Sequence, residues 1–292
     1  MTEFRIQHST TYAYDAEVTG SYGQFHLRPR DLAWQRCLAH EIRIDPEPTD
    51  LFRHTDLYGN TKSYFHVVRP HTRLEVTAIS VLELEPPRYD EPAMAVPWDQ
   101  ARPLDRGDVA DAWQAADYVF ASPMVDIPPG VREYAEPSFP AGRPIAEAAT
   151  ELMHRIYADF KYQSGSTTVS TRVGELLERR TGVCQDYTHF MVSCLRSLGL
   201  AGRYVSGYLA TRPPPGKPRL VGADASHAWV GCWIPGTGWL YLDPTNNRLT
   251  DASHATVAWG RDYADVTPVK GVIFTEAKSS TMDVSVDMAP TG

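Results

Sequence analysis

Residues 181–199 read TGVCQDYTHFMVSCLRSLG, and this stretch predicts how the second half of the chain folds. After Cys184, apolar residues recur at three- and four-residue steps, which is the spacing of one buried helix face. They are Tyr187, Phe190, Met191, Cys194, Leu195 and Leu198. Gly199 is the expected C-terminal stop of this helix. Cys184 precedes the apolar face, so we place it at the helix start and outside the core.

The start of a helix suits a nucleophilic cysteine. The first N–H groups of a helix have no partner within it, and the positive end of the helix dipole favours an anion such as a thiolate. The thiolate is the nucleophilic form of cysteine. The backbone N–H of Cys184 would also face a developing oxyanion. A thiolate used in this way needs an imidazole as its base and a third group that orients the imidazole.

Two neighbouring strands are expected to supply these partners. His227 lies on a predicted strand, residues 225–234, and Asp243 follows the next predicted strand, residues 239–242. The Pro-Gly-Thr-Gly turn between the strands makes them antiparallel neighbours, so the two side chains can lie next to each other. We therefore predict that Cys184, His227 and Asp243 form a catalytic triad.

The first part of the chain shows a different pattern. Apolar and polar residues alternate with a period of two, which is typical of strands with one buried face. The alternating segments are residues 4–14, 38–44, 63–67 and 74–84, with a hairpin turn at Gly59-Asn60. Residues 1–85 are thus expected to form an antiparallel β domain, a β-sandwich.

The rest of the chain divides into a linker and a second domain. Prolines interrupt every periodic run in residues 86–143, which we interpret as a linker with short helices. Residues 144–292 are expected to form an α+β core with C-terminal strands. Its expected elements are a helix at 145–160, a short helix at 173–177 capped by Thr171, and strands at 203–209, 272–275 and 282–286, besides those named above.

Composition excludes several classes of protein. Hydrophobic residues make up 42% and aromatic residues 11%, which is enough for packed cores. The net charge is −8 and there is no block of Lys and Arg, so we expect no nucleic-acid partner. We find no signal-peptide pattern and no apolar run near 18 residues, and expect a cytoplasmic protein with no membrane partner. Metal-binding and cofactor-binding motifs are also lacking, so we expect no cofactor and no metal.

Three segments carry a resemblance to a known family. Residues 181–186 (TGVCQD), 226–229 (SHAW) and 238–245 (GWLYLDPT) resemble, in this order, the three blocks of the transglutaminase-like superfamily. The β-rich front with residues 56–60 (DLYGN) and the tail at 260–268 (GRDYADVTP) resemble bacterial members that have an extra N-terminal domain and are described as cysteine proteases. The resemblance covers nearly the whole chain.

The resemblance implies a papain-like core in which the cysteine opens a helix that packs on an antiparallel sheet. It also implies acyl transfer through a thioester on a peptide or protein substrate. A water acceptor would make the enzyme a cysteine protease or amidase, and an amine acceptor would make it a transglutaminase. A third alternative is a non-catalytic binding module, because some members have lost triad residues. The oligomeric state stays open at this point.

Other residues near the triad have simpler interpretations. Cys194 fits the helix core, and Cys37 and Cys232 are taken as structural. His189 lies over one turn beyond Cys184 and ranks below His227 as the base. Asp186 is interpreted as a first-turn acid, and Trp229 and Trp239 as packing residues of the sheet. The alternatives for a second oxyanion donor are Tyr162, Gln163 and Gln185. Asp224 is interpreted as a solvated loop acid, with substrate contact as the minor alternative.

Overall fold

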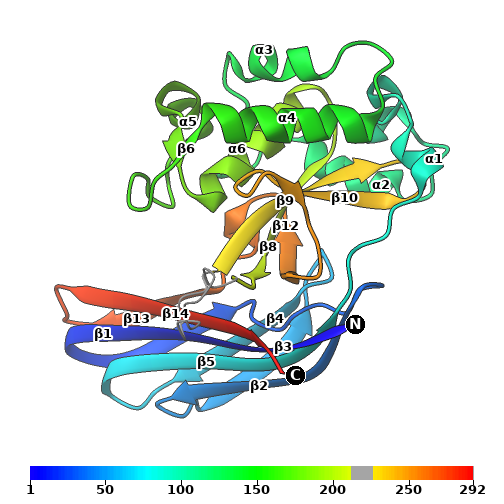
Figure 1. Cartoon of the computed structure of the whole chain (residues 1–292). Helices are drawn as coiled ribbons and strands as arrows, with labels where there is room; N and C mark the ends of the chain where they lie inside the picture. Colours follow the sequence, from blue (N-terminus) through cyan, green and yellow to red (C-terminus); the bar gives the residue numbers. More distant parts are fainter. Residues whose placement is uncertain (212–225, 292) are drawn as a thin grey trace, which may run out of the picture.

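The computed structural model describes residues 1–211 and 226–291 (Figure 1). Helices lie at the top of this view, a five-stranded sheet lies in the middle, and a large curved sheet lies at the bottom. Both ends of the chain are on the large sheet. The expected α+β class, with helices against an antiparallel sheet in the second domain, is confirmed.

The large sheet is organised around one long strand, β1 (Thr2–Phe25). The sheet order is β2-β5-β1-β4-β3, and β1 also pairs with β13 and β14. The first part of β1 pairs with β5 and β14, whereas its end pairs with β4 and β13. The other bounds are β2 (Gln35–Asp45), β3 (Asp50–Thr55), β4 (Thr61–Val67) and β5 (His71–Leu84).

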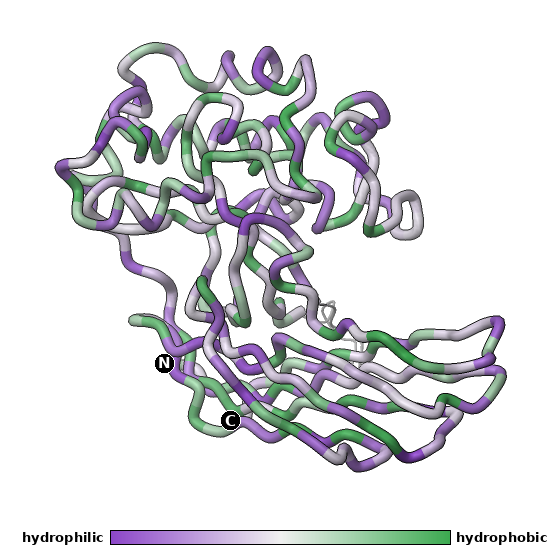
Figure 2. The backbone as a smooth tube through the Cα atoms, turned by 180° about the vertical axis from the view of Figure 1, so that it is seen from behind, coloured by the Kyte–Doolittle hydropathy of each residue, from purple (hydrophilic) through white to green (hydrophobic). Residues whose placement is uncertain are grey.

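One curled sheet provides the expected sandwich. Because β1 changes partners along its length, the sheet turns on itself and encloses an apolar cluster. The cluster includes Phe25, Phe65, Val67, Leu74 and Val76, all of which are buried. Figure 2 shows the two halves of this curled sheet from behind. The predicted N-terminal β domain is therefore present, as a single sheet that packs against itself.

The expectation that residues 144–292, including the C-terminal strands, form the second domain is wrong for these strands. Strands β13 (Val269–Thr275) and β14 (Ser280–Pro290) lie antiparallel to β1, in the first sheet. The period-two pattern locates a strand but does not say which sheet edge it joins. Here the two strands complete the hydrogen bonding of β1, so the first domain is built from both ends of the chain.

The proline-rich segment 86–143 contains short helices, as predicted, but it is packed rather than extended. Trp98, Val131 and Tyr134 are buried in the apolar cluster of the second domain. The segment contains α1 (Glu91–Met94), α2 (Ala112–Ala116), α3 (Val131–Ala135) and 3₁₀ turns at Trp98–Gln100, Pro103–Asp105, Asp117–Val119 and Glu136–Ser138. It thus covers the second domain in addition to linking the two.

The second domain packs helices against a five-stranded antiparallel sheet with the order β11-β10-β9-β8-β12. Helix α6 packs on β8 and β9, and α4 packs on β9 and β10. The sheet strands are β8 (Gly202–Leu209), β9 (Ser226–Ile234), β10 (Gly238–Asp243), β11 (Arg248–Leu249) and β12 (His254–Gly260). The helices are α4 (Ile145–Asp159), α5 (Val173–Arg179) and α6 (Cys184–Ser197), with β6 (Lys161–Tyr162) paired to β7 (Thr181–Gly182) and a 3₁₀ turn at Tyr263–Asp265.

Strand register determines which side chains share the sheet face that points away from α6. Directly paired residues lie on the same face, and every second residue returns to it. One row across this face is Arg203, Gly231 and Tyr241. Further along β9 on the same face come Trp229 and then His227, which pairs with Gly207. Residues of the first domain cover this face, since Gln35 bonds to the backbone of Thr256 on β12.

One local expectation was wrong, and one strand was missed. Thr171 does not cap α5, because the N-cap residue is Arg172 and the Thr171 hydroxyl accepts from the N–H of Thr168 instead. Strand β12 was not predicted at all, since a register shift between Thr256 and Ala258 breaks its period-two pattern.

Candidate active site

Cys184 is the first residue of α6, where the sequence placed it. Its position is held by Asp186, whose carboxylate accepts the backbone N–H of Val183 at 2.7 Å and the hydroxyl of Thr167 at 2.6 Å. A side chain at Gly182 would come within 2.7 Å of the Asp186 carboxylate, so this position requires glycine. The chain is thereby turned sharply into the helix just before the thiol. Asp186 is more than a dipole partner, because it fixes the entry into α6.

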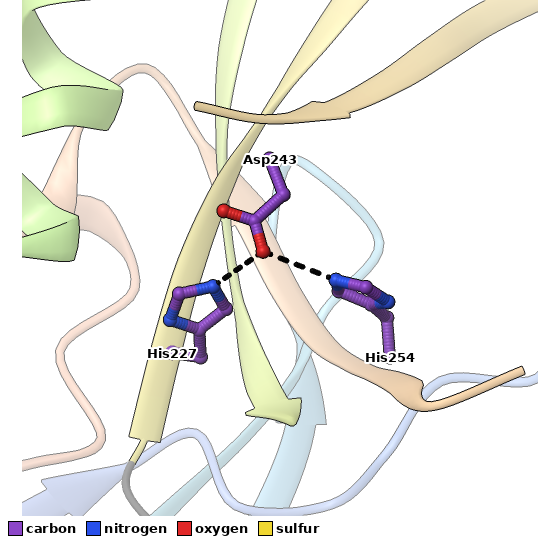
Figure 3. A group of neighbouring side chains, drawn as sticks. All are labelled: His227, Asp243 and His254. Carbon is purple, nitrogen blue, oxygen red and sulfur yellow. Dashed lines mark hydrogen bonds and ion pairs between the residues drawn. The ribbon is translucent and has the colours of Figure 1, made fainter. Parts of the chain in front are cut away.

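His227 and Asp243 lie together at the ends of two adjacent strands (Figure 3). The predicted antiparallel pairing of β9 and β10 is confirmed, and His227 Nε2 lies 2.8 Å from Asp243 Oδ2. The His227 side chain is only 9% exposed. Burial alone would lower the pKa of His227, but hydrogen bonds to Asp243 and to Cys184, together with their negative charges, raise it to about 10. Since Nε2 is bound to Asp243, Nδ1 is the ring nitrogen left for Cys184.

The carboxylate of Asp243 is fully buried and fully bonded. Oδ1 accepts the backbone N–H groups of Thr245 and Asn246, at 3.0 and 3.2 Å. Oδ2 accepts the Asn246 side-chain amide at 2.7 Å in addition to His227. Burial by itself would raise the pKa of Asp243, but the hydrogen bonds from its histidine neighbours hold it well below the usual range. The two histidines therefore keep this acid ionised.

A second histidine, which sequence reasoning missed, also reaches Asp243. His254 Nε2 lies 3.2 Å from Asp243 Oδ2 (Figure 3). The other ring nitrogen, Nδ1, lies 3.1 Å from Asp251 Oδ1. His254 is the first residue of β12, the strand that was not predicted. The hydrogen bond to His254 is also part of what lowers the pKa of Asp251. A chain of hydrogen bonds thus runs from His227 through Asp243 and His254 to Asp251.

The charge of Cys184 affects three tyrosines. Burial, with the charge of Cys184 as a further cause, raises the pKa of Tyr162, Tyr204 and Tyr263. Tyr204 is buried, whereas Tyr162 is 54% exposed. Of the three alternatives for a second oxyanion donor, Gln185 donates its amide to the carbonyl of Val169 and Gln163 donates its backbone N–H to Gly182. Tyr162 is the alternative whose pKa is affected by the charge of Cys184.

The remaining candidates occupy structural positions. His189 is buried, accepts the N–H of Tyr263 at 3.2 Å, and has its pKa lowered to about 4 by burial. Cys194 and Cys232 are completely buried, while Cys37 is half-buried in the first domain. Trp229 lies in the apolar cluster on the sheet face, and Trp239 is partly buried beside it. Asp224 and the first residue of the strand predicted at 225–234 lie outside the described residues.

The group around Asp243 also has the composition of a metal site. His227, Asp243 and His254 can each offer one ligand atom, and these atoms lie within 4.8 Å of one another. Two imidazoles and a carboxylate are donors that Zn²⁺ accepts. An ion there would take the same Nε2 of His227 that Asp243 uses to orient the ring. Metal binding and triad geometry therefore compete for one nitrogen atom.

Comparison with known proteins gives two family matches. Residues 4–83 match the bacterial transglutaminase-like N-terminal region, and residues 133–244 match the transglutaminase-like superfamily. An uncharacterised protein of Mycobacterium tuberculosis strain H37Rv is 47% identical over 294 residues, covering 98% of this chain and 92% of that protein. Both domains thus match known sequences.

A solved structure and a shorter sequence match add to this. The crystal structure of a “Putative Cysteine Protease” from Cytophaga hutchinsonii matches with a TM-score of 0.75 and 20% identity, covering 100% of this chain and 91% of that one. It shares the fold of both domains. A protein-glutamine gamma-glutamyltransferase of Pseudomonas aeruginosa is 41% identical over 71 residues, which are 24% of this chain and 11% of that protein. No described helix is long and apolar enough to cross a membrane.

Proposed function

Because this chain belongs to the transglutaminase-like superfamily, we propose that it is a thiol enzyme that cleaves amide bonds of a peptide or protein substrate with Cys184, His227 and Asp243. The observation that carries the proposal is the position of His227. Its Nε2 lies 2.8 Å from Asp243 Oδ2, and Cys184 is a further cause of the raised pKa of the ring. An imidazole that is oriented by a buried carboxylate and interacts with a cysteine at a helix start is the arrangement expected of a nucleophile and its base.

The chemistry follows from the protonation of His227. With its pKa raised to about 10, the imidazole carries a proton at neutral pH beside the thiolate of Cys184. The sulfur attacks the amide carbon, and the oxyanion is stabilised by the free N–H groups at the start of α6. His227 gives its proton to the leaving amine, so a thioester remains on Cys184. His227, now neutral, takes a proton from water, which attacks the thioester and releases the acid.

Alkylation of the free cysteines gives a direct test. Iodoacetamide at neutral pH should label Cys184 and abolish amide cleavage, because the imidazolium of His227 favours the thiolate. Cys37 is a matched control, since it is also half-buried and free, but burial raises its pKa. Cys184→Ala should lower kcat by at least about 10⁴-fold, while Cys37→Ala should not change it. Equal labelling of Cys37 and Cys184 would contradict the proposal.

Transfer to an amine is the second candidate, and the match to the P. aeruginosa gamma-glutamyltransferase favours it. The acyl-enzyme would be the same, and a lysine amine would take the place of water. The two acceptors are separated by incubating the protein with a glutamine peptide and a fluorescent amine. Ammonia release with incorporation of the amine indicates transfer, whereas ammonia release alone indicates hydrolysis. Cys184→Ala should abolish both.

A further inference from the structure

A pocket of about 480 Å³ opens on the same sheet face as the triad, where the two domains meet. Its walls come from distant parts of the chain: Arg30 and Tyr58 from the first domain, Trp113 from α2, and Arg203, Trp239 and Trp259 from the second domain. Arg203 lies four residues along the strand direction from the position that pairs with His227, or roughly 13 Å. The pocket is therefore separate from the catalytic residues.

Two arginines stack with two tryptophans along the wall of this pocket. The Arg203 guanidinium lies 4.1 Å from the ring centre of Trp239 and 3.7 Å from that of Trp259. The Arg30 guanidinium lies 3.5 Å from the centre of the Trp259 ring. Trp259 is thus in contact with both cations. Stacking on aromatic faces stabilises a guanidinium but does not neutralise its charge.

Neither arginine has an acidic partner within ion-pair distance among the described residues. Arg203 is 4% exposed, and its side chain bonds only to the Tyr241 hydroxyl. Arg30 bonds to the carbonyl of Tyr58 and to the side chain of Asn60. The Nε atoms of both arginines are buried without a hydrogen-bond partner. Buried charges are normally paired, so the pocket wall has an excess of positive charge and unused donors.

The nearby acids do not remove this excess. Asp117 lines the pocket, but its carboxylate accepts the hydroxyl of Tyr58 at 2.6 Å. Asp56 accepts the side chain and backbone of Asn60. Among the residues that line the pocket, the two guanidinium groups of Arg30 and Arg203 outnumber the one carboxylate, that of Asp117. In agreement, burial and then the charge of Arg203 lower the pKa of Arg30 to about 10.

Two glycines make room for the arginines. A side chain at Gly231 would come within 2.9 Å of Arg203 Cγ, and one at Gly59 would come within 3.0 Å of Arg30 Nη2. Gly59 has a positive φ of 74° in addition. Because larger side chains at these two positions would collide with the arginines, the glycines keep the space that both arginine side chains occupy before a ligand binds.

The rim of the pocket is apolar and exposed. Trp113 is 74% exposed and Leu57 is 89% exposed, and both line the pocket. Exposed apolar side chains around a polar floor are typical of a ligand site. Carboxylate and phosphate groups match the planar donor set of arginine. We propose that this pocket binds a small organic anion, whose carboxylate or phosphate contacts Arg30 and Arg203 and whose apolar part contacts Trp113.

Binding can be measured by tryptophan fluorescence on the full chain, because three tryptophans line the pocket. The probes are phenylacetate, phenyl phosphate, inorganic phosphate and the neutral phenylacetamide. We expect phenylacetate or phenyl phosphate to bind saturably, and phenylacetamide to bind at least about tenfold more weakly. Which of the two anions binds more tightly separates a carboxylate ligand from a phosphate ligand.

Three variants localise the signal. Arg30→Gln should weaken both organic anions at least about tenfold, equivalent to about 1.4 kcal/mol. Trp113→Ala should weaken phenyl phosphate but leave inorganic phosphate unchanged, and because Trp113 is exposed this variant should fold normally. Arg73→Gln removes an exposed positive charge on β5 that does not line the pocket, and it should have no effect. Equal binding of phenylacetamide, full binding to Arg30→Gln, or no saturable signal up to about 10 mM would overturn the proposal.

Discussion

The two ends of one sheet face bury charge in opposite ways. At the triad end, the Asp243 carboxylate receives hydrogen bonds from His227, His254, Asn246 and the backbone. At the pocket end, Arg30 and Arg203 stack on indole rings and leave buried Nε atoms without partners. Trp229 lies between them, since its ring centre is 5.3 Å from that of His254 and it packs in the same cluster as Trp239 and Trp259.

This difference separates a complete site from an incomplete one. The end at the proposed triad needs no further group to satisfy its charges, so His227 and Asp243 are held in one arrangement. The pocket end has donors and positive charge for which the described residues supply no acceptor. A buried charge without a partner is costly, and a bound anion would reduce that cost. The comparison can be tested by changing each end and by adding the missing anion.

The largest effect is expected from Asp243→Asn, which removes the charge at the complete end. Asp243 raises the pKa of His227, so without it that pKa should fall toward its ordinary value. Because the raised pKa keeps His227 protonated up to about pH 10, activity in the unaltered protein should decline only above that pH. In the variant, kcat should fall about 10⁴-fold, and the remaining activity should decline at a lower pH.

The matched control for this experiment is Asp108→Asn, which removes a carboxylate that is 67% exposed and distant in sequence from the triad. Its rate and pH profile should equal those of the unaltered protein. If Asp243→Asn keeps the alkaline limit near pH 10, the carboxylate does not hold His227 in its charged form, and the assignment of Asp243 is wrong.

A smaller effect is expected at His254, which touches Asp243 but not Cys184. His254→Leu removes one hydrogen-bond donor to a buried carboxylate, and such a loss costs about 1–3 kcal/mol of stabilisation. If part of this stabilisation acts in the transition state, kcat should fall by up to about tenfold. His254→Gln keeps an N–H donor and should restore most of the rate. The pH profile separates positioning from folding, because a weaker hold on Asp243 should move the alkaline limit of His254→Leu downward. Unchanged kcat and pH profile in His254→Leu would show that His254 is only structural.

Much of the fold could be predicted from local patterns. The apolar face after Cys184 predicts α6, and the period-two pattern predicts the first part of β1 and most of β2, β4 and β5, because helix and strand spacings are local properties. The partner of each strand is not a local property. For this reason the prediction placed β13 and β14 in the wrong domain, whereas they pair with β1. Strand β12, with its register shift, was not predicted.

The two sites also differ in how far their residues can be predicted from local sequence patterns. The predicted site residues His227 and Asp243 lie on strands joined by a short turn, so the structure brings them together through a local contact. His254 and Asn246 could not be assigned, because their role depends on where Asp243 points. Arg30 and Arg203 come from segments of different domains and meet only over Trp259. A pattern within one segment carries no signal for such a meeting.

The smallest effect is expected from supplying an anion to the incomplete end. A ligand present at ten times its Kd stabilises the folded state by about 1.4 kcal/mol, so phenylacetate or phenyl phosphate at that level should raise Tm by roughly 2–4 °C. Phenylacetamide should not raise it. The shift should disappear in Arg30→Gln and persist in Cys184→Ala, because the pocket lies apart from the thiol. A Tm shift that disappears in Cys184→Ala but persists in Arg30→Gln would mean that the anion binds at the triad. The proposal that only the pocket end lacks a partner for its charge would then be wrong.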